Sequence, residues 1–165
     1  MPRVVPVCSF LLHTVLPMTK PTTENKSAAD VTIRPATRDD LPALAQLITG
    51  YVKANRLLPR TQSELDDLIP FGFVACLSDR VVGFAALEIY SSKLAEVRSL
   101  AVAPEMQGNG LGKRLVQECV ELAQSRNVLE VMAITSAEDF FQSCGFDFTL
   151  PGEKKALFVR TREEL

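Results

Sequence analysis

The segment that decides the fold runs from Leu94 to Arg114 and reads LAEVRSLAVAPEMQGNGLGKR. Its first part, Ala95–Val102, has the apolar and β-branched content of a strand, and Pro104 ends it. A glycine-rich turn follows, and an amphipathic helix begins near Leu111. Glycine tolerates a positive φ and carries no Cβ, so the N–H groups of this turn can converge on the spot that the positive helix end also faces. The sequence therefore predicts an anion site, with a pyrophosphate as the expected ligand.

Two common phosphate-binding motifs do not match this turn. A P-loop requires glycine in place of Gln107 and Ser or Thr in place of Arg114, and a dinucleotide fingerprint requires glycine in place of Lys113. The spacing that does fit is Gln/Arg-x-x-Gly-x-Gly/Ala, with Gln107, Gly110 and Gly112 at the fixed positions. After a strand and a proline-ended loop, this motif resembles the GCN5-related N-acetyltransferase (GNAT) superfamily, in which loop and helix hold the pyrophosphate of acetyl-CoA.

The resemblance covers residues 31–162 and implies an α/β (α+β) GNAT fold. It implies a central, mixed, mostly antiparallel twisted sheet of about six to seven strands, flanked by about four helices. Hydrophobic patterning predicts strands at Val31–Pro35, Phe71–Leu77, Val81–Tyr90, Ala95–Val102, Val128–Thr135, Phe146–Leu150 and Ala156–Thr161. The expected helices follow the capping boxes Thr37-x-x-Asp40 and Thr61-x-x-Glu64 and occupy Leu111–Arg126 and Ser136–Cys144. The near-continuous apolar run Val128–Thr135 is typical of a strand covered on both faces.

The same resemblance implies how acetyl-CoA binds. Its pantetheine arm would lie along the central strand, in main-chain contact with Leu100, Ala101 and Val102, and the N–H of Leu100 would polarise the thioester carbonyl. The residues expected to hold the pyrophosphate are consecutive: Gln107, Gly108, Asn109, Gly110, Leu111, Gly112 and Lys113. Acetyl-CoA is thus the expected co-substrate, and no metal ion is expected.

Acetyl transfer needs a group that removes a proton from the amine, and it benefits from an acid for the leaving thiolate. The resemblance makes Glu96 the candidate base; the alternative is a solvated strand glutamate paired with Lys93 or Arg98. The tyrosine that the family uses as an acid falls at Phe141, which cannot donate a proton. Ser136 is a candidate substitute, and its alternative role is the N-cap of the helix that follows it.

The segment Leu57–Leu65 resembles part of the GNAT domain of N-acetylglutamate synthases. That resemblance places the contacts to substrate carboxylates at Arg60 and Arg162, with Arg98 and Arg160 as neighbours, and guanidinium groups bind carboxylates bidentately. The predicted reaction is acetyl transfer from acetyl-CoA to the α-amine of a free amino acid, L-glutamate, by direct attack in a ternary complex, as in arginine biosynthesis. The alternatives are another small amine, a polyamine or a protein N-terminus as acceptor, or a non-catalytic acyl-CoA-binding module.

Composition narrows the remaining possibilities. A net charge of −2 over 165 residues gives no electrostatic reason to expect nucleic acid or an acidic membrane as a partner. The four cysteines lie apart in the sequence, which favours reduced thiols in the cytoplasm. The only histidine, His13, precedes the expected domain, so histidine-based zinc or triad chemistry is not expected there.

The chain is expected to divide into an N-terminal extension, residues 1–30, and one acetyltransferase domain, residues 31–165. The extension contains an apolar run, Val4–Leu16, that is too short to span a bilayer. The polar run from Met18 cannot build a packed element, and we expect translation to start at Met18. The resemblance makes a homodimer one expected assembly, although no stretch identifies an interface.

Overall fold

The computed structural model of the chain describes residues 30–149 and residue 159. These residues contain a five-stranded sheet in the order β1-β2-β3-β4-β5. The first four strands pair antiparallel and β5 runs parallel to β4, which confirms a mixed, mostly antiparallel sheet. The strands are β1 Val31–Pro35, β2 Gly72–Leu77, β3 Arg80–Ser91, β4 Leu94–Val102 and β5 Glu130–Met132.

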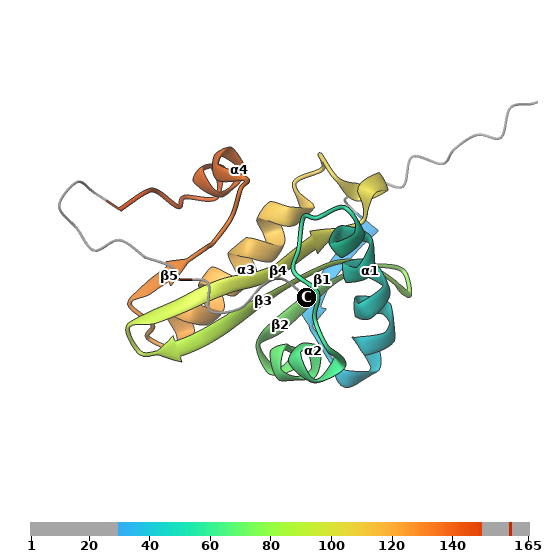
Figure 1. The fold of residues 1–165 in the computed structure, drawn as a ribbon, viewed down its shortest axis with the longest axis horizontal. Coiled ribbons are helices and arrows are strands. Elements are labelled where there is room, and N and C mark those ends of the chain that lie inside the picture. Colours follow the sequence, from blue (N-terminus) through green and yellow to red (C-terminus); the bar gives the residue numbers. More distant parts are fainter. Residues whose placement is uncertain (1–29, 150–158, 160–165) are drawn as a thin grey trace, which may run out of the picture.

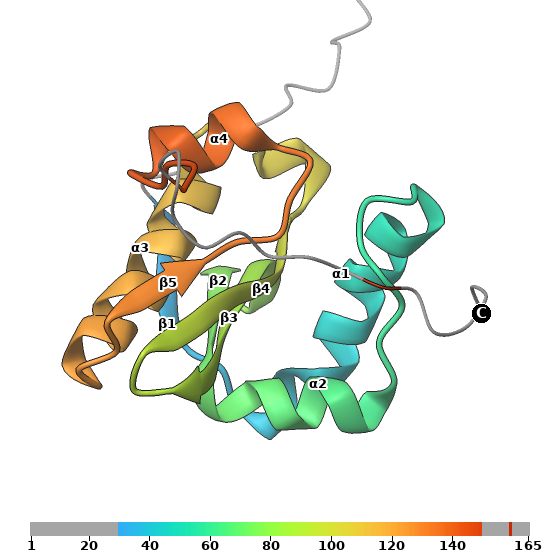
Figure 2. The same ribbon diagram turned by 60° about the vertical axis from the view of Figure 1, so that its left-hand side comes forward.

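Four α-helices flank this sheet, as expected (Figure 1). They are α1 Leu41–Lys53, α2 Gln62–Leu68, α3 Leu111–Ser125 and α4 Glu138–Ser143. Figures 1 and 2 show α1 and α2 on one face of the sheet and α3 on the other. The expected capping boxes are present: Thr37 and Asp40 close one before α1, and Thr61 and Glu64 close the other at the start of α2.

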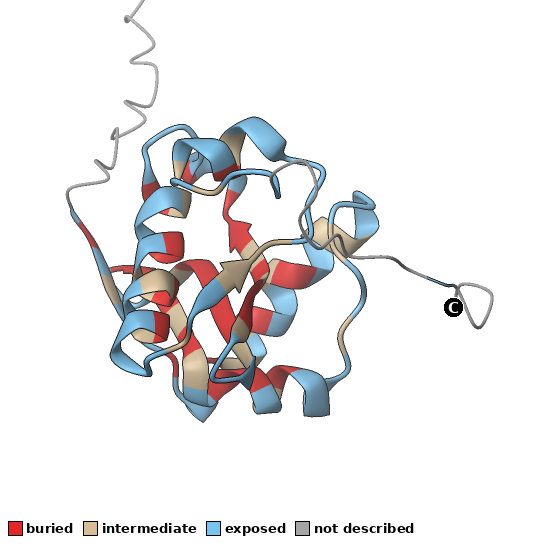
Figure 3. Cartoon of the chain, turned by 90° about the vertical axis from the view of Figure 1, so that its left-hand side faces the viewer, coloured by how far each residue is buried: buried red, intermediate tan, exposed pale blue. Residues whose placement is uncertain are grey.

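Two apolar layers hold the helices to the sheet (Figure 3). On one face α3 buries Leu115, Cys119 and Ala123, which recur at the four-residue spacing of a helix face. On the other, Leu44 and Ile48 of α1 meet the apolar residues of α2. Each fully buried leucine contributes roughly 1.5–3 kcal/mol by leaving water, so these two layers fix which face of the sheet each helix covers.

The C-terminal part differs from the prediction, beginning with its first expected strand. The run Val128–Thr135 forms a strand only at Glu130–Met132, where it is exposed to half-buried rather than covered on both faces. Val128 instead donates its N–H to the Ala123 carbonyl at the end of α3 and packs on the α3 layer. Its apolar character therefore reflects burial against a helix, not strand pairing.

The last expected hairpin is not seen in the described residues. Phe146–Thr149 forms no strand, and Phe146 instead packs edge-to-face on Phe141 at a centroid distance of 5.3 Å. Most of the partner strand, Ala156–Thr161, lies outside the described residues, as does Leu150. The described residues thus form five of the expected six to seven strands.

A buried carboxylate ties β1 to the entry of α1. Asp40 is 6% exposed and accepts two hydrogen bonds of 2.8 Å from the Arg34 guanidinium and one of 2.8 Å from the Thr37 N–H. The hydrogen bond from Arg34, followed by those from Thr37, lowers the pKa of Asp40 from 3.8 to about 2. The ionised carboxylate is therefore the form that the fold prefers.

We expect Asp40→Asn to lower the free energy of unfolding by about 1–2 kcal/mol at neutral pH. Solvent screening keeps the loss this small, because the Arg34 side chain is 45% exposed. Since the folded pKa lies below the unfolded one, the contribution is complete above pH 4 and is lost as the pH falls toward 2. Urea unfolding of both proteins between pH 7 and pH 3 measures this. Asp66→Asn, which removes a pair with the exposed Arg38, is the control, and an equal loss there would contradict the expectation.

Candidate functional site

A bulge in β4 prepares one edge of the sheet. Ser99 and Leu100 together face the single Ala85 of β3, and Ser99 has a φ of +56°. β5 pairs only with Leu94–Glu96, so no described strand covers the outer edge of β4 beyond that point. Because N–H groups alternate along a strand, Leu100 and Val102 direct theirs to this same edge. The uncovered edge can therefore pair with an extended chain, as β-augmentation requires.

The glycine turn lies directly after this edge. Gly108 and Gly110 have φ values of +77° and +74°, which side chains with a Cβ rarely adopt. The N–H groups in the first turn of α3 have no intrahelical partner, as at any helix start, and no side chain caps them. At Gly112 the requirement is space, because a Cβ would lie 3.3 Å from the Phe140 ring. The predicted anion site thus has the backbone geometry that such a site needs.

The side chains of this segment are largely engaged within the protein. The Lys113 ammonium donates a hydrogen bond of 2.6 Å to the Ser143 carbonyl, which connects α3 to α4. The Gln107 amide donates to the Val102 carbonyl at 2.9 Å. Leu111 is buried in the α3 layer, whereas Asn109 is exposed. Backbone N–H groups are therefore the donors that this segment offers to an anion.

The candidate base, Glu96, lies on the α1/α2 face of the sheet. It is 7% exposed, accepts a hydrogen bond of 2.5 Å from the Tyr90 hydroxyl, and lies 3.9 Å from Nε of Arg98. Glu96 is therefore buried, and the alternative of a solvated glutamate is wrong on this point. Its expected neighbour Arg98 is present. Arg98 also pairs with Glu88, which is opposite Glu96 in the register. One guanidinium thus bridges two facing carboxylates that would otherwise repel.

Tyr90 is a residue that sequence reasoning missed. Burial, followed by the hydrogen bond to Glu96, raises the pKa of Tyr90 to about 12, so its hydroxyl is a donor at neutral pH. Half of the side chain faces solvent, whereas the carboxylate beneath it does not. The available signal was the two-residue spacing of Glu88 and Tyr90, which places both on one strand face. Only the register of β3 against β4 places Glu96 opposite Glu88 and within reach of the Tyr90 hydroxyl.

Arg60 lies just before α2, with its side chain 16% exposed and 3.9 Å from the Glu64 carboxylate. Hydrogen bonds from Thr61 lower the pKa of Glu64, and the charges of Arg60 and Arg98 lower it further. Two of the predicted carboxylate-binding arginines therefore lie near carboxylates of the protein itself, Arg60 near Glu64 and Arg98 near Glu88 and Glu96. The other two, Arg160 and Arg162, lie outside the described residues.

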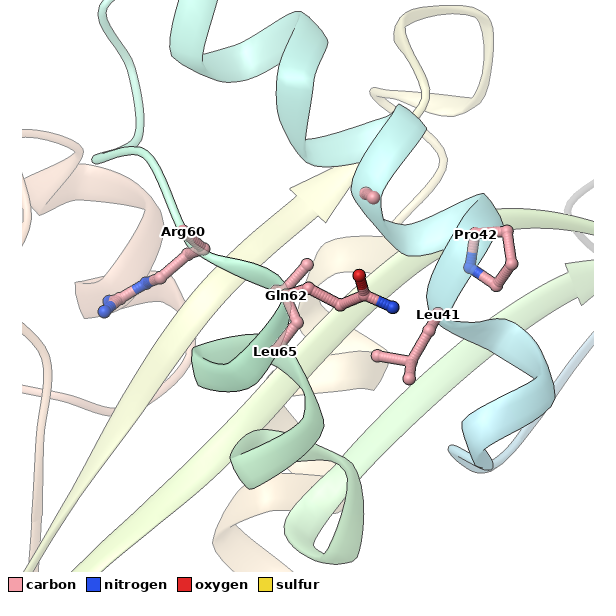
Figure 4. A pocket seen from close by; sticks show the side chains of 6 residues that line it. Leu41, Pro42, Arg60, Gln62 and Leu65 are labelled. Carbon is pink, nitrogen blue, oxygen red and sulfur yellow. The ribbon is translucent and has the colours of Figure 1, made fainter.

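A shallow cavity of about 270 Å³ opens between α1 and α2 (Figure 4). Its lining residues are Leu41, Pro42, Ala45, Arg60, Gln62 and Leu65. In Figure 4 the Gln62 side chain extends toward Leu41 and Pro42, whereas Arg60 points the opposite way. No residue of β3 or β4 lines this cavity, so it belongs to the seam between the helices and not to the site around Glu96.

Ser136 lies in a second, open hollow of about 390 Å³ at the start of α4. It is exposed and does not cap the helix, because α4 begins at Glu138 and Ala137 occupies the N-cap position. The expected N-cap at Ser136 is therefore wrong by one residue, and its role as an acid stays a prediction. Phe141, at the position of the family tyrosine, is buried in the α3 layer.

Residues 30–149 and 159 have the features of neither a metal centre nor a membrane span. No group of three or more His, Cys, Asp or Glu side chains is placed to hold a metal ion there. Within the same residues, every helix falls short of the length and apolar content needed to cross a membrane.

Comparison with known proteins adds to this geometry. The profile of the acetyltransferase (GNAT) family matches residues 41–146. An uncharacterized N-acetyltransferase of Chlorobaculum tepidum is 34% identical over 119 residues, which cover 72% of this chain and 77% of that protein. An amino-acid acetyltransferase of Mycobacterium tuberculosis is 32% identical over 117 residues, which cover 69% of this chain and 67% of that protein.

Solved structures agree with these relatives. A protein of Mycobacterium tuberculosis in complex with CoA superposes with a TM-score of 0.68 at 30% identity, covering 76% of each chain. The N-acetylglutamate synthase of Neisseria gonorrhoeae, complexed with CoA and N-acetyl-glutamate, gives 0.63 at 26% identity; the match covers 68% of this chain and 27% of the synthase. The chain therefore belongs to the acetyltransferase (GNAT) family and is an N-acetyltransferase whose acetyl donor is acetyl-CoA.

Proposed function

We propose that this N-acetyltransferase acetylates the α-amine of a free amino acid that carries a second carboxylate, with L-glutamate as the acceptor. The observation that carries the proposal is a charge pattern on one face of the sheet. Buried Glu96 lies 3.9 Å from Arg98, and on the same side of the sheet Arg60, just before α2, has a side chain that is only 16% exposed. The amino-acid acetyltransferase among the relatives supports the same class of acceptor.

Glu96 is proposed as the base that removes the proton from the attacking ammonium. Each carboxylate oxygen has two acceptor positions, so Glu96 can receive this proton directly or through water while Tyr90 holds Oε2. The freed amine then attacks the thioester carbon, and the N–H of Leu100 stabilises the oxyanion that forms. Collapse of this intermediate breaks the carbon–sulfur bond, and the departing CoA thiolate takes up the second proton of the attacking nitrogen, so the products are CoA and the N-acetyl amino acid.

The acceptor carboxylates are proposed to bind Arg60 and, outside the described residues, Arg162. Arg60 suits this role because its only described carboxylate partner, Glu64, is at 3.9 Å, beyond hydrogen-bond distance. A substrate carboxylate can therefore form bidentate hydrogen bonds that Glu64 does not make. Arg98 is already paired with Glu88, so we assign it to positioning the carboxylates of the sheet rather than to gripping substrate.

The experiment that tests this function measures CoA release by the full chain with acetyl-CoA and a panel of acceptors. The panel contains L-glutamate, L-aspartate, L-glutamine, L-alanine, spermidine and a short peptide. We expect kcat/KM for L-glutamate to exceed that for L-glutamine at least about 10-fold, because glutamine leaves a guanidinium without its charge partner. Preference for spermidine or the peptide would refute the acceptor but not the family, and no turnover with any acceptor would favour a binding module.

A further inference from the structure

The hydroxyl of Tyr51 covers the β4 edge at Val102. It donates to the Val102 carbonyl at 2.5 Å and accepts a hydrogen bond of 3.1 Å from the N–H of the same residue. Both main-chain groups of Val102 are therefore satisfied by one oxygen atom from α1, 51 positions earlier in the chain. A neighbouring strand would satisfy the same two groups with an amide N–H and a carbonyl oxygen.

Gln107 completes this network. Its amide nitrogen donates to the Tyr51 hydroxyl at 2.7 Å and to the Val102 carbonyl at 2.9 Å. A hydroxyl has one donor and two acceptor positions, and an amide nitrogen has two donors, so every position used here has a partner. The network thus links the outer edge of β4 at Val102 to Gln107, the first residue of the glycine turn.

An extended ligand cannot pair with Val102 while Tyr51 does. Beyond Glu96 no described strand competes for this edge, and the glycine turn at its end has the geometry for an anion. CoA joins a chain containing amide bonds to a pyrophosphate, and that combination matches an open strand edge followed by an anion-binding turn. The amide of the ligand and the hydroxyl of Tyr51 therefore require the same two groups of Val102.

We propose that Tyr51 is a built-in competitor of the acyl-CoA donor: its hydroxyl closes the β4 edge at Val102 in the free protein and must leave when the donor binds. Departure of this hydroxyl also removes one of the two acceptors of the Gln107 amide, so the change at the edge reaches the first residue of the glycine turn. This inference rests on binding of the donor along β4, which is part of the proposed function, and it is independent of the acceptor.

The test is calorimetric titration of CoA into the wild-type chain and into Tyr51→Phe. Phenylalanine keeps the ring and removes the hydroxyl, so the variant no longer loses that network on binding. We expect the Kd for CoA to fall about 5-fold in Tyr51→Phe, the factor that corresponds to one net hydrogen bond. An unchanged Kd would overturn the proposal, and a higher Kd would show that the hydroxyl is a ligand of CoA.

A second measurement does not use the Tyr51→Phe variant. The chain has two tyrosines and no tryptophan, so 3-fluorotyrosine labelling of the wild-type chain gives two fluorine resonances, which Tyr90→Phe assigns. We expect CoA to shift the Tyr51 resonance as the hydroxyl leaves Val102, and a Tyr51 resonance that CoA does not move would overturn the proposal. Failure of the wild-type chain to bind CoA would instead refute the donor site on which both proposals rest.

Discussion

Glu96→Gln is expected to lower kcat about 10²–10³-fold at pH 8 with L-glutamate and acetyl-CoA, which is the usual loss on removing a general base. Glutamine keeps the size of the side chain and can accept from the Tyr90 hydroxyl, but it cannot take up the proton of the ammonium. Glutamine has nearly the same shape as glutamate, so the substitution should preserve the packing of this buried side chain against Tyr90 and Arg98. Steady-state kinetics with saturating acetyl-CoA measure the effect.

The matched control is Glu88→Gln on the facing strand. Glu88 lies opposite Glu96 and shares Arg98 with it, but its side chain is 38% exposed and 3.5 Å from the Tyr90 hydroxyl. We expect a smaller loss there, below about 10-fold, because the variant removes only an ion pair in contact with solvent. A larger loss for Glu88→Gln than for Glu96→Gln would transfer the role of base to Glu88.

A second large effect is expected at the acceptor site. Arg60→Ala should raise the KM for L-glutamate about 10–100-fold, because it removes a charge-assisted pair with a substrate carboxylate. The KM for acetyl-CoA should stay within about 2-fold of its original value, since Arg60 precedes α2 and the donor is expected along β4. Arg60→Lys should recover part of the loss, because lysine keeps the charge but not the planar fork.

Arg38→Ala provides the control for this prediction. Arg38 also pairs with an acidic residue of α2, Asp66, but its side chain is 78% exposed. We expect its removal to leave the KM for L-glutamate within about 2-fold, as for an ordinary surface pair. Equal losses in the two variants would mean that Arg60 acts through the placement of α2 and not through contact with the acceptor.

Local sequence determined most of the N-terminal and central fold. The periodic apolar residues of α1 and α3, the capping boxes at Thr37 and Thr61, and the glycine turn before α3 each depend on interactions within a few residues. Such short-range preferences act in any tertiary context, and the structure has all of these elements. The anion-binding geometry of Gly108 and Gly110 could be predicted for the same reason, because their positive φ is a local property.

The C-terminal part shows where apolar content alone misleads. Burial against a helix and burial within a sheet have the same composition, so the run Val128–Thr135 could not reveal that only Glu130–Met132 pairs with β4. Likewise, Ser136 is a favourable N-cap residue by type, yet α4 begins at Glu138, and its Phe141 is buried in the α3 layer.

The contacts around Glu96 and Val102 were decided only by the tertiary structure. The sequence identified Glu96 on the central strand, but the register of β3 against β4 gives it Tyr90 as donor and Arg98 as neighbour. By its spacing from Leu44 and Ile48, Tyr51 is only one more position on the same face of α1, yet its hydroxyl reaches a peptide group 51 residues later. Strand register and helix docking are long-range properties, set by how whole faces pack, so no local pattern in the sequence contains them.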